Sequence, residues 1–131
     1  MNRLAILDFL TKKNVQKYYE IYKDTQWYSE EDMAKFQLEK LRNLLKHCYE
    51  NVPYYRKIID KQKINYKSFS SLDILKEFPI LTKELIQHNY SDFYPKNYKK
   101  IKGHKISQTG GTTGNILIKR SDANTRSSIW A

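Results

Sequence analysis

The sequence contains one cysteine and no long run of apolar residues. Cys48 has no partner for an internal disulfide, and a lone thiol in a helix is more often a small core residue than a nucleophile. No stretch approaches the ~20 apolar residues that span a bilayer. An apolar run near the start is interrupted by Asp8, and no small-residue cleavage site follows it, which argues against a signal peptide. We therefore expect a cytoplasmic protein.

The sequence also lacks the signatures of a metal site and of the two best-known nucleotide-binding loops. His47, His88 and His104 are far apart and show no ligand spacing such as H-x-x-x-H. No pair of glycines five positions apart precedes Lys-Ser/Thr, so a Walker A loop is excluded, and no G-x-G-x-x-G occurs. We expect neither a metal centre nor a Rossmann-type dinucleotide site.

Basic residues exceed acidic ones. The 24 Lys and Arg residues against 14 Asp and Glu residues give a formal net charge of +10. Such an excess is typical of proteins that bind nucleic acid or anionic membranes, and the eleven tyrosines could stack on bases. The basic residues are nevertheless spread along the chain without a block longer than two, as on an ordinary solvated surface. We favour the solvated surface, and a non-enzymatic module that binds nucleic acid or another polyanion remains the alternative.

Residues 1–98 predict a series of amphipathic helices. Apolar residues recur at helical spacing over 14–24 and again over 29–49, where Ser29 is a good N-cap. Pro53 ends the second of these helices and opens the next. Two short helices follow, LDILKEF after Ser70 or Ser71 and KELIQHNY after Thr82. Nothing in this helical region suggests catalysis.

The pattern changes after Gly103. HKISQT predicts a short strand, ILIKR predicts a second strand, and Ser121 or Asp122 would cap a final helix, ANTRSSIWA. The apolar pair Ile129 and Trp130 lies close to the last residue and faces no partner within the sequence. We therefore expect residues 99–131 to be the start of an α/β domain that the chain does not complete.

The loop between the predicted strands has the composition of a phosphate-binding segment. Three of the four glycines lie within five residues and alternate with threonines. Glycine allows consecutive backbone N–H groups to approach an anion, and threonine hydroxyls add neutral donors. The candidate residues are Thr109, Gly110, Gly111, Thr112, Thr113 and Gly114. Lys119, Arg120 and Arg126 could supply charge, although strand alternation sends the first two to opposite faces. On composition alone, an ordinary hairpin with a glycine-rich turn is an equal alternative.

A family resemblance favours the phosphate-binding interpretation. TGGTTG resembles the Ser/Thr/Gly-rich phosphate loop of the adenylate-forming superfamily, which includes the acyl-CoA synthetases. LRNLLKHCYENVPYYRKIID and SFSSLDILKEFPILTKELI, which precede the loop, resemble the phenylacetate–CoA ligase branch and its capsular polysaccharide biosynthesis relatives. The resemblance covers roughly residues 38–131, and residues 1–37 add little.

The resemblance implies the parent's fold and chemistry. The parent would be an α/β enzyme, and this chain would be its amino-terminal fragment, mainly α-helical with a short strand pair around the loop. The enzyme would activate a small carboxylic acid with ATP and Mg²⁺ and pass the acyl group to coenzyme A or another acceptor. Residues 109–114 would hold the ATP phosphates.

Two positions depart from the family pattern. Ile116 replaces a proline that many relatives have, and Asn115 stands where a lysine is common in other branches. The family's adenine pocket, metal-binding acid and carboxy-terminal lysine would lie beyond the last residue, so we expect the fragment alone to be inactive. An inactive gene remnant is a further alternative.

Overall fold

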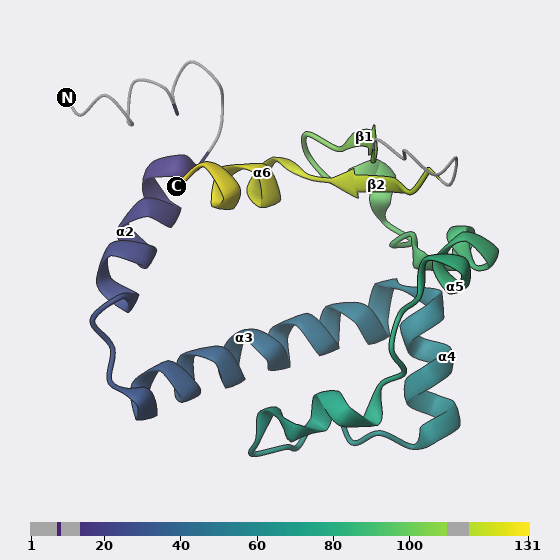
Figure 1. Cartoon of the computed structure of the whole chain (residues 1–131), viewed down its shortest axis with the longest axis horizontal. Helices are drawn as coiled ribbons and strands as arrows, with labels where there is room; N and C mark the ends of the chain where they lie inside the picture. The colour runs from purple at the N-terminus through teal and green to yellow at the C-terminus, as the bar shows by residue number, and fades with distance from the viewer. Residues whose placement is uncertain (1–7, 9–13, 110–115) are drawn as a thin grey trace. The chain divides into compact units, whose positions relative to one another are not determined.

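The computed structural model describes residues 8, 14–109 and 116–131. These residues are mainly helical, with one antiparallel pair of strands among them, as the sequence predicted (Figure 1). The chain forms two compact units, which are Glu30–Tyr98 on one side and Met1–Ser29 together with Lys99–Ala131 on the other. The predicted division into 1–98 and 99–131 concerns the parent enzyme and stays a prediction.

The unit Glu30–Tyr98 is built on α3 and α4. It contains α3 (Glu30–Asn51), α4 (Pro53–Gln62), η1 (Leu72–Glu77), α5 (Lys83–His88) and η2 (Tyr90–Phe93). The predicted boundaries at Pro53, Ser71 and Thr82 are confirmed, since the proline opens α4 and both hydroxyls accept backbone N–H bonds as N-caps. The LDILKEF helix is a 3₁₀ helix, because only six residues separate its cap from the extended Phe78 that precedes Pro79.

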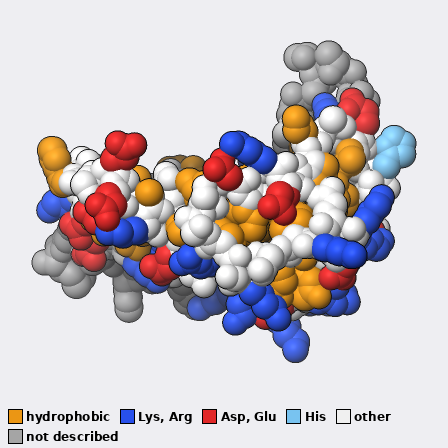
Figure 2. All heavy atoms as spheres, turned by 90° about the horizontal axis from the view of Figure 1, so that it is seen from below, with side chains coloured by type: hydrophobic (Ala, Val, Ile, Leu, Met, Phe, Trp, Pro, Cys, Tyr) orange, Lys and Arg blue, Asp and Glu red, His pale blue; other side chains and the backbone are white. Residues whose placement is uncertain are grey.

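The core of this unit lies between α3, α4 and η1. Five buried aliphatic residues form it: Leu41, Leu45, Ile59, Ile64 and Ile74. Aromatic rings surround this cluster, and Tyr49 and Tyr66 stack with centroids 4.5 Å apart. The apolar pattern predicted over 29–49 is only partly buried, because Ala34 is exposed and Leu44 is 55% exposed. Apolar side chains therefore remain at the surface among charged ones (Figure 2).

Arg56 closes the carboxyl end of α3. Its Nε donates to the Tyr49 carbonyl and its Nη2 to the Glu50 carbonyl, both at 2.7 Å. The last carbonyls of a helix have no partner within the helix, and Pro53 prevents the next residues from supplying one in helical geometry. A side chain from the first turns of α4 therefore binds two carbonyls at the end of α3, and it fixes the corner between the two helices.

Changing Arg56 to alanine is expected to destabilise this unit by about 1.5–3 kcal/mol, the usual contribution of hydrogen bonds to a charged group. The sole cysteine provides the measurement: Cys48 is buried, and burial raises the pKa of its thiol, so it should react slowly with a thiol reagent in the folded chain. Arg56→Ala should accelerate labelling by about 10- to 100-fold. Arg56→Lys keeps the charge and one donor site, so its labelling rate should lie between those of the unchanged chain and Arg56→Ala. Equal rates in all three proteins would contradict this assignment.

The unit formed by Met1–Ser29 and Lys99–Ala131 contains α2 (Val15–Thr25), β1 (Lys105–Gln108), β2 (Ile118–Ser121) and α6 (Ala123–Trp130), and η3 (Tyr98–Lys100) lies at its boundary. Helices α2 and α6 pack side by side (Figure 1). The apolar pattern predicted over 14–24 is only partly buried in α2: Val15 is buried, but Tyr19 and Tyr22 are about two-fifths exposed. Among the described residues of this unit, α2 packs against α6, and these two tyrosines stay partly exposed.

Candidate functional site

The candidate loop joins two strands that pair directly. Strands β1 and β2 are antiparallel, and Lys105 lies opposite Ser121 at one end while Gln108 lies opposite Ile118 at the other. The two predicted strands are thus confirmed. Nine residues, 109–117, separate them, which is more than the two to five of a tight hairpin. A hairpin is present, but its loop is longer than the reversal of the chain requires.

Thr109 and Leu117 close the base of the loop. The Thr109 N–H donates to the Leu117 carbonyl at 3.0 Å, and the Leu117 N–H donates to the Thr109 Oγ1 at 3.1 Å. The Thr109 hydroxyl also donates to the Leu117 carbonyl at 3.4 Å. Backbone and side chain together fix where the loop leaves and rejoins the sheet.

Thr109 is the only predicted site residue within the described part of the chain. Its hydroxyl is engaged at the base of the loop, as both donor and acceptor. Gly110, Gly111, Thr112, Thr113 and Gly114 lie outside the described residues. Their assignment to nucleotide phosphates therefore stays a prediction.

The three cations near the loop have different surroundings. Lys119 is exposed and Arg120 is half-buried, as strand alternation predicted. The Arg120 Nη1 lies 3.3 Å from the His104 Nε2, where the guanidinium is the donor. Arg126 donates to the Gly103 carbonyl at 2.9 Å and to the carbonyl and hydroxyl of Ser121 at 3.3 Å. Arg126 thus ties the turn before β1 to the end of β2, a structural role that sequence reasoning missed.

The turn that precedes β1 packs tightly against the start of α6. Gly103 has a φ of +68°, the left-handed region that favours glycine, and a Cβ at this position would lie 2.8 Å from the Ala123 Cβ. The Ala123 N–H donates to the Lys102 carbonyl at 3.3 Å. A small residue on each side therefore allows the turn and the helix to approach and sets the position of the hairpin.

Asp122 caps α6, as the sequence predicted. Its Oδ1 accepts the Thr125 N–H at 2.6 Å. Burial of the carboxyl acts to raise its pKa, but the hydrogen bonds from the backbone and side chain of Thr125 and the charge of Arg126 outweigh burial and lower the pKa below its ordinary value. The folded state thus prefers the charged form of Asp122.

The cap predicts a pH dependence of stability. Because the pKa of Asp122 is lower in the folded chain, its contribution is complete above the unfolded pKa, about 4, and is lost as the pH falls through the folded value. Asp122→Ala is expected to destabilise the unit by about 1 kcal/mol at pH 7. Asp122→Asn, which still caps, should lose less at pH 7 and should remove this acid dependence. Urea unfolding at pH 7 and pH 3, followed at the amides of α6, tests the prediction, and an unchanged acid dependence in Asp122→Asn would contradict it.

Helix α2 holds α6 through polar contacts that the sequence did not reveal. The fully buried Ser127 accepts the Asn14 N–H at 3.1 Å and donates to the Ala123 carbonyl at 2.8 Å. The hydroxyls of Tyr22 and Ser128 lie 2.6 Å apart. Residues separated by more than a hundred positions are thereby joined, and the amino-terminal helix helps to position the element that follows the hairpin.

Two further observations concern the whole described part of the chain. Within residues 8, 14–109 and 116–131, no three His, Cys, Asp or Glu side chains gather closely enough to hold a metal ion. Among the same residues, no helix combines the length and the apolar character that crossing a membrane requires.

Comparison with known proteins relates the chain to a family. No protein-family model matches the sequence. The phenylacetate–coenzyme A ligase of Aromatoleum evansii is 34% identical over 90 residues, which are 69% of this chain and 20% of the ligase. The phenylacetate–coenzyme A ligase of Escherichia coli K12 is 33% identical over 91 residues, again 69% and 20%. The chain is a relative of the phenylacetate–coenzyme A ligases.

A third phenylacetate–coenzyme A ligase, from Thermus thermophilus, is 29% identical over 91 residues, or 67% of this chain. The chain spans about a fifth of the length of these curated ligases. The predicted family resemblance is therefore confirmed, and it extends over about two thirds of the chain.

Proposed function

We propose that this chain is part of an ATP-dependent carboxylate–coenzyme A ligase, in which residues 109–114 bind the nucleotide phosphates. The relationship to phenylacetate–coenzyme A ligases carries this proposal. The glycine- and threonine-rich loop supports it, because the loop is longer than a tight turn and both its ends are fixed by the bonds between Thr109 and Leu117.

The reaction has two steps. A carboxylate oxygen of the acid attacks the α-phosphorus of ATP, the bond to the β-phosphate oxygen breaks, and pyrophosphate leaves with the electron pair. The thiol of coenzyme A then loses its proton and attacks the acyl carbon, and AMP leaves as the thioester forms. Mg²⁺ bound to the ATP phosphates would neutralise part of their charge.

The loop would stabilise the departing pyrophosphate without transferring a proton. Backbone N–H groups and threonine hydroxyls are fixed neutral donors, which suit the charge that develops on the leaving group. Glycines would let the backbone approach the phosphates closely. The 131 residues alone are expected to be inactive, because the adenine pocket, metal-binding acid and carboxy-terminal lysine implied by the resemblance lie outside them.

A chimeric enzyme tests the proposal. The matched 91 residues of the Escherichia coli ligase are replaced by the matching residues of this chain, and acid-dependent exchange of labelled pyrophosphate into ATP is measured. We expect exchange with phenylacetate and none without an acid. A folded chimera that binds neither ATP nor pyrophosphate and supports no exchange would contradict the proposal.

A further inference from the structure

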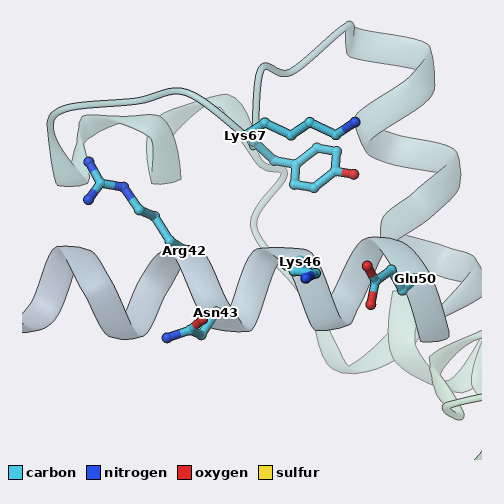
Figure 3. Close-up of a pocket in the computed structure, with 6 residues that line it drawn as sticks. Arg42, Asn43, Lys46, Glu50 and Lys67 are labelled. Atoms are coloured by element: carbon cyan, nitrogen blue, oxygen red, sulfur yellow. The ribbon is translucent and has the colours of Figure 1, made fainter.

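A basic cavity lies in the unit Glu30–Tyr98. It has a volume of about 460 Å³, and α3 and the segment after α4 line it. Figure 3 shows Arg42, Lys46 and Glu50 following one another along α3, with Lys67 across from them. The complete lining is Arg42, Asn43, Lys46, Glu50, Tyr66 and Lys67. Three cations and one carboxylate thus share a single hollow.

The lysines that line this cavity differ from several other lysines of the chain in their ion pairing. Lys35, Lys57 and Lys76 each lie within 2.5–2.7 Å of a carboxylate oxygen. Within the described residues, neither Lys46 nor Lys67 forms such an ion pair. Arg42 contacts a backbone carbonyl rather than an acid, with its Nη2 donating to the Phe69 oxygen at 2.8 Å. With Glu50 as the single acid, the lining carries a net charge of about +2.

The backbone around Lys67 is held in place, so this charge has a defined position. Lys63 ends α4 in the left-handed conformation, and the Ile64 N–H donates to the Ile59 carbonyl at 3.0 Å. The Ser68 N–H donates to the Asn65 Oδ1 at 3.2 Å. Tyr66 stacks on Tyr49, and the Lys67 Nζ lies 5.8 Å from the Tyr66 ring centroid. The segment opposite α3 is therefore anchored at both of its ends.

We propose that this cavity binds the phosphate or diphosphate group of a small molecule. A phosphate group carries a charge of about −1.5 to −2 at neutral pH, which matches the net charge of the lining. Lys46 and Lys67 can donate charge-assisted hydrogen bonds to its oxygens, and Tyr66 supplies a neutral donor. Arg42 points away from Lys67 (Figure 3) and adds charge at the rim. This site is separate in sequence from the loop at 109–114 and does not depend on the proposed ligase activity.

Glu50 favours a single anionic group over a nucleic acid. It lines the same cavity one helical turn beyond Lys46 and adds a negative charge at that end. A continuous phosphate backbone that passed over the cavity would meet this carboxylate, whereas one phosphate group would need to approach only Lys46 and Lys67. The cavity is thus better matched to a small molecule than to a strand of DNA or RNA.

Titration of the ¹⁵N-labelled 131-residue chain with inorganic pyrophosphate tests the inference. Saturable shifts of the backbone amides of residues 42–50 and 66–67 are expected. Lys46→Gln should weaken this binding by about tenfold or more, since it removes one charge-assisted contact. Lys40→Gln removes the same charge from the same helix outside the cavity and should leave binding within about twofold, since it removes no contact with the ligand. Both lysines are exposed, so the fold should survive each change.

Further titrations distinguish the possible sources of the phosphate group and test the competing explanations. ATP that shifts the same amides would show that a nucleotide can supply the group, and pyrophosphate binding without ATP binding would assign a free diphosphate. The variant with both Thr112→Val and Thr113→Val should retain these shifts, because it changes only the loop. Loss of the shifts in that variant, equal weakening by Lys40→Gln, or much tighter binding of a DNA duplex at these amides would overturn the inference.

Discussion

In the chimeric ligase, changing Thr112 and Thr113 together to valine is expected to lower kcat/KM by about 100- to 1,000-fold. Valine matches threonine in shape, so the change removes two hydroxyl donors with little change in volume. Donors that stabilise charge in a transition state commonly contribute this much each or in pairs. If they act on the departing pyrophosphate, kcat should fall more than KM rises.

The matched control replaces both residues with serine. Thr112→Ser with Thr113→Ser keeps both hydroxyls, so most of the activity should remain. Steady-state kinetics with varied ATP and a saturating acid separate the two effects. An active valine variant, or equal losses in the valine and serine variants, would show that the hydroxyls do not act on the phosphates.

Gly103→Ala is expected to have the largest effect on the stability of the hairpin unit, about 2–4 kcal/mol. Two costs combine: a left-handed backbone conformation for a residue with a Cβ, and a contact of 2.8 Å with the Ala123 Cβ that forces the turn and α6 apart. Hydrogen exchange at the Thr109 and Leu117 amides, followed with increasing urea, measures the loss at the base of the loop.

A second substitution separates the two costs. Ala123→Gly removes the Cβ in contact, after which the nearest atoms to the new Cβ are backbone atoms at 3.4 Å. Gly103→Ala combined with Ala123→Gly should therefore recover the part of the loss due to contact and keep about 1–2 kcal/mol due to conformation. If the stability loss of the double variant equalled the sum of the losses of the two single variants, the contact assigned between these two residues would be contradicted.

Local signals in the sequence predicted most of the elements. Helix boundaries were expected at Pro53, at Thr82, at Ser70 or Ser71, and at Ser121 or Asp122. The structure has them at Pro53, Thr82, Ser71 and Asp122. These residues act on backbone groups within three or four positions, so their effect is visible in a short stretch of sequence. The two strands were predicted for a similar reason, because glycines mark the turn before the first strand and the loop that separates the two.

Contacts between distant residues were not predictable in this way. Asp8 caps α2 by accepting the N–H groups of Val15 and Gln16 at 2.8 Å, although Asn14 is the residue directly before the helix. Arg56 and Arg126 donate to backbone carbonyls, which every residue carries, so the sequence does not reveal these partners. The basic residues that line the cavity looked like parts of a solvated surface, because their grouping depends on how the segment after α4 folds back toward α3.

The candidate phosphate site could be predicted from the sequence only in part. Its flanking strands follow the prediction, and the family resemblance of the chain is confirmed by the curated relatives. The role of Thr109 at the base of the loop was not foreseen, because it depends on the register with Leu117. The contacts of residues 110–114 with a ligand remain the central prediction.

A crystal structure of the chimeric ligase with Mg²⁺ and a non-hydrolysable ATP analogue tests this prediction most directly. We expect phosphate oxygens of the analogue within hydrogen-bonding distance of backbone N–H groups and hydroxyls between Thr109 and Gly114. An analogue bound with its phosphates elsewhere in the chimera, and no contact to this loop, would contradict the account.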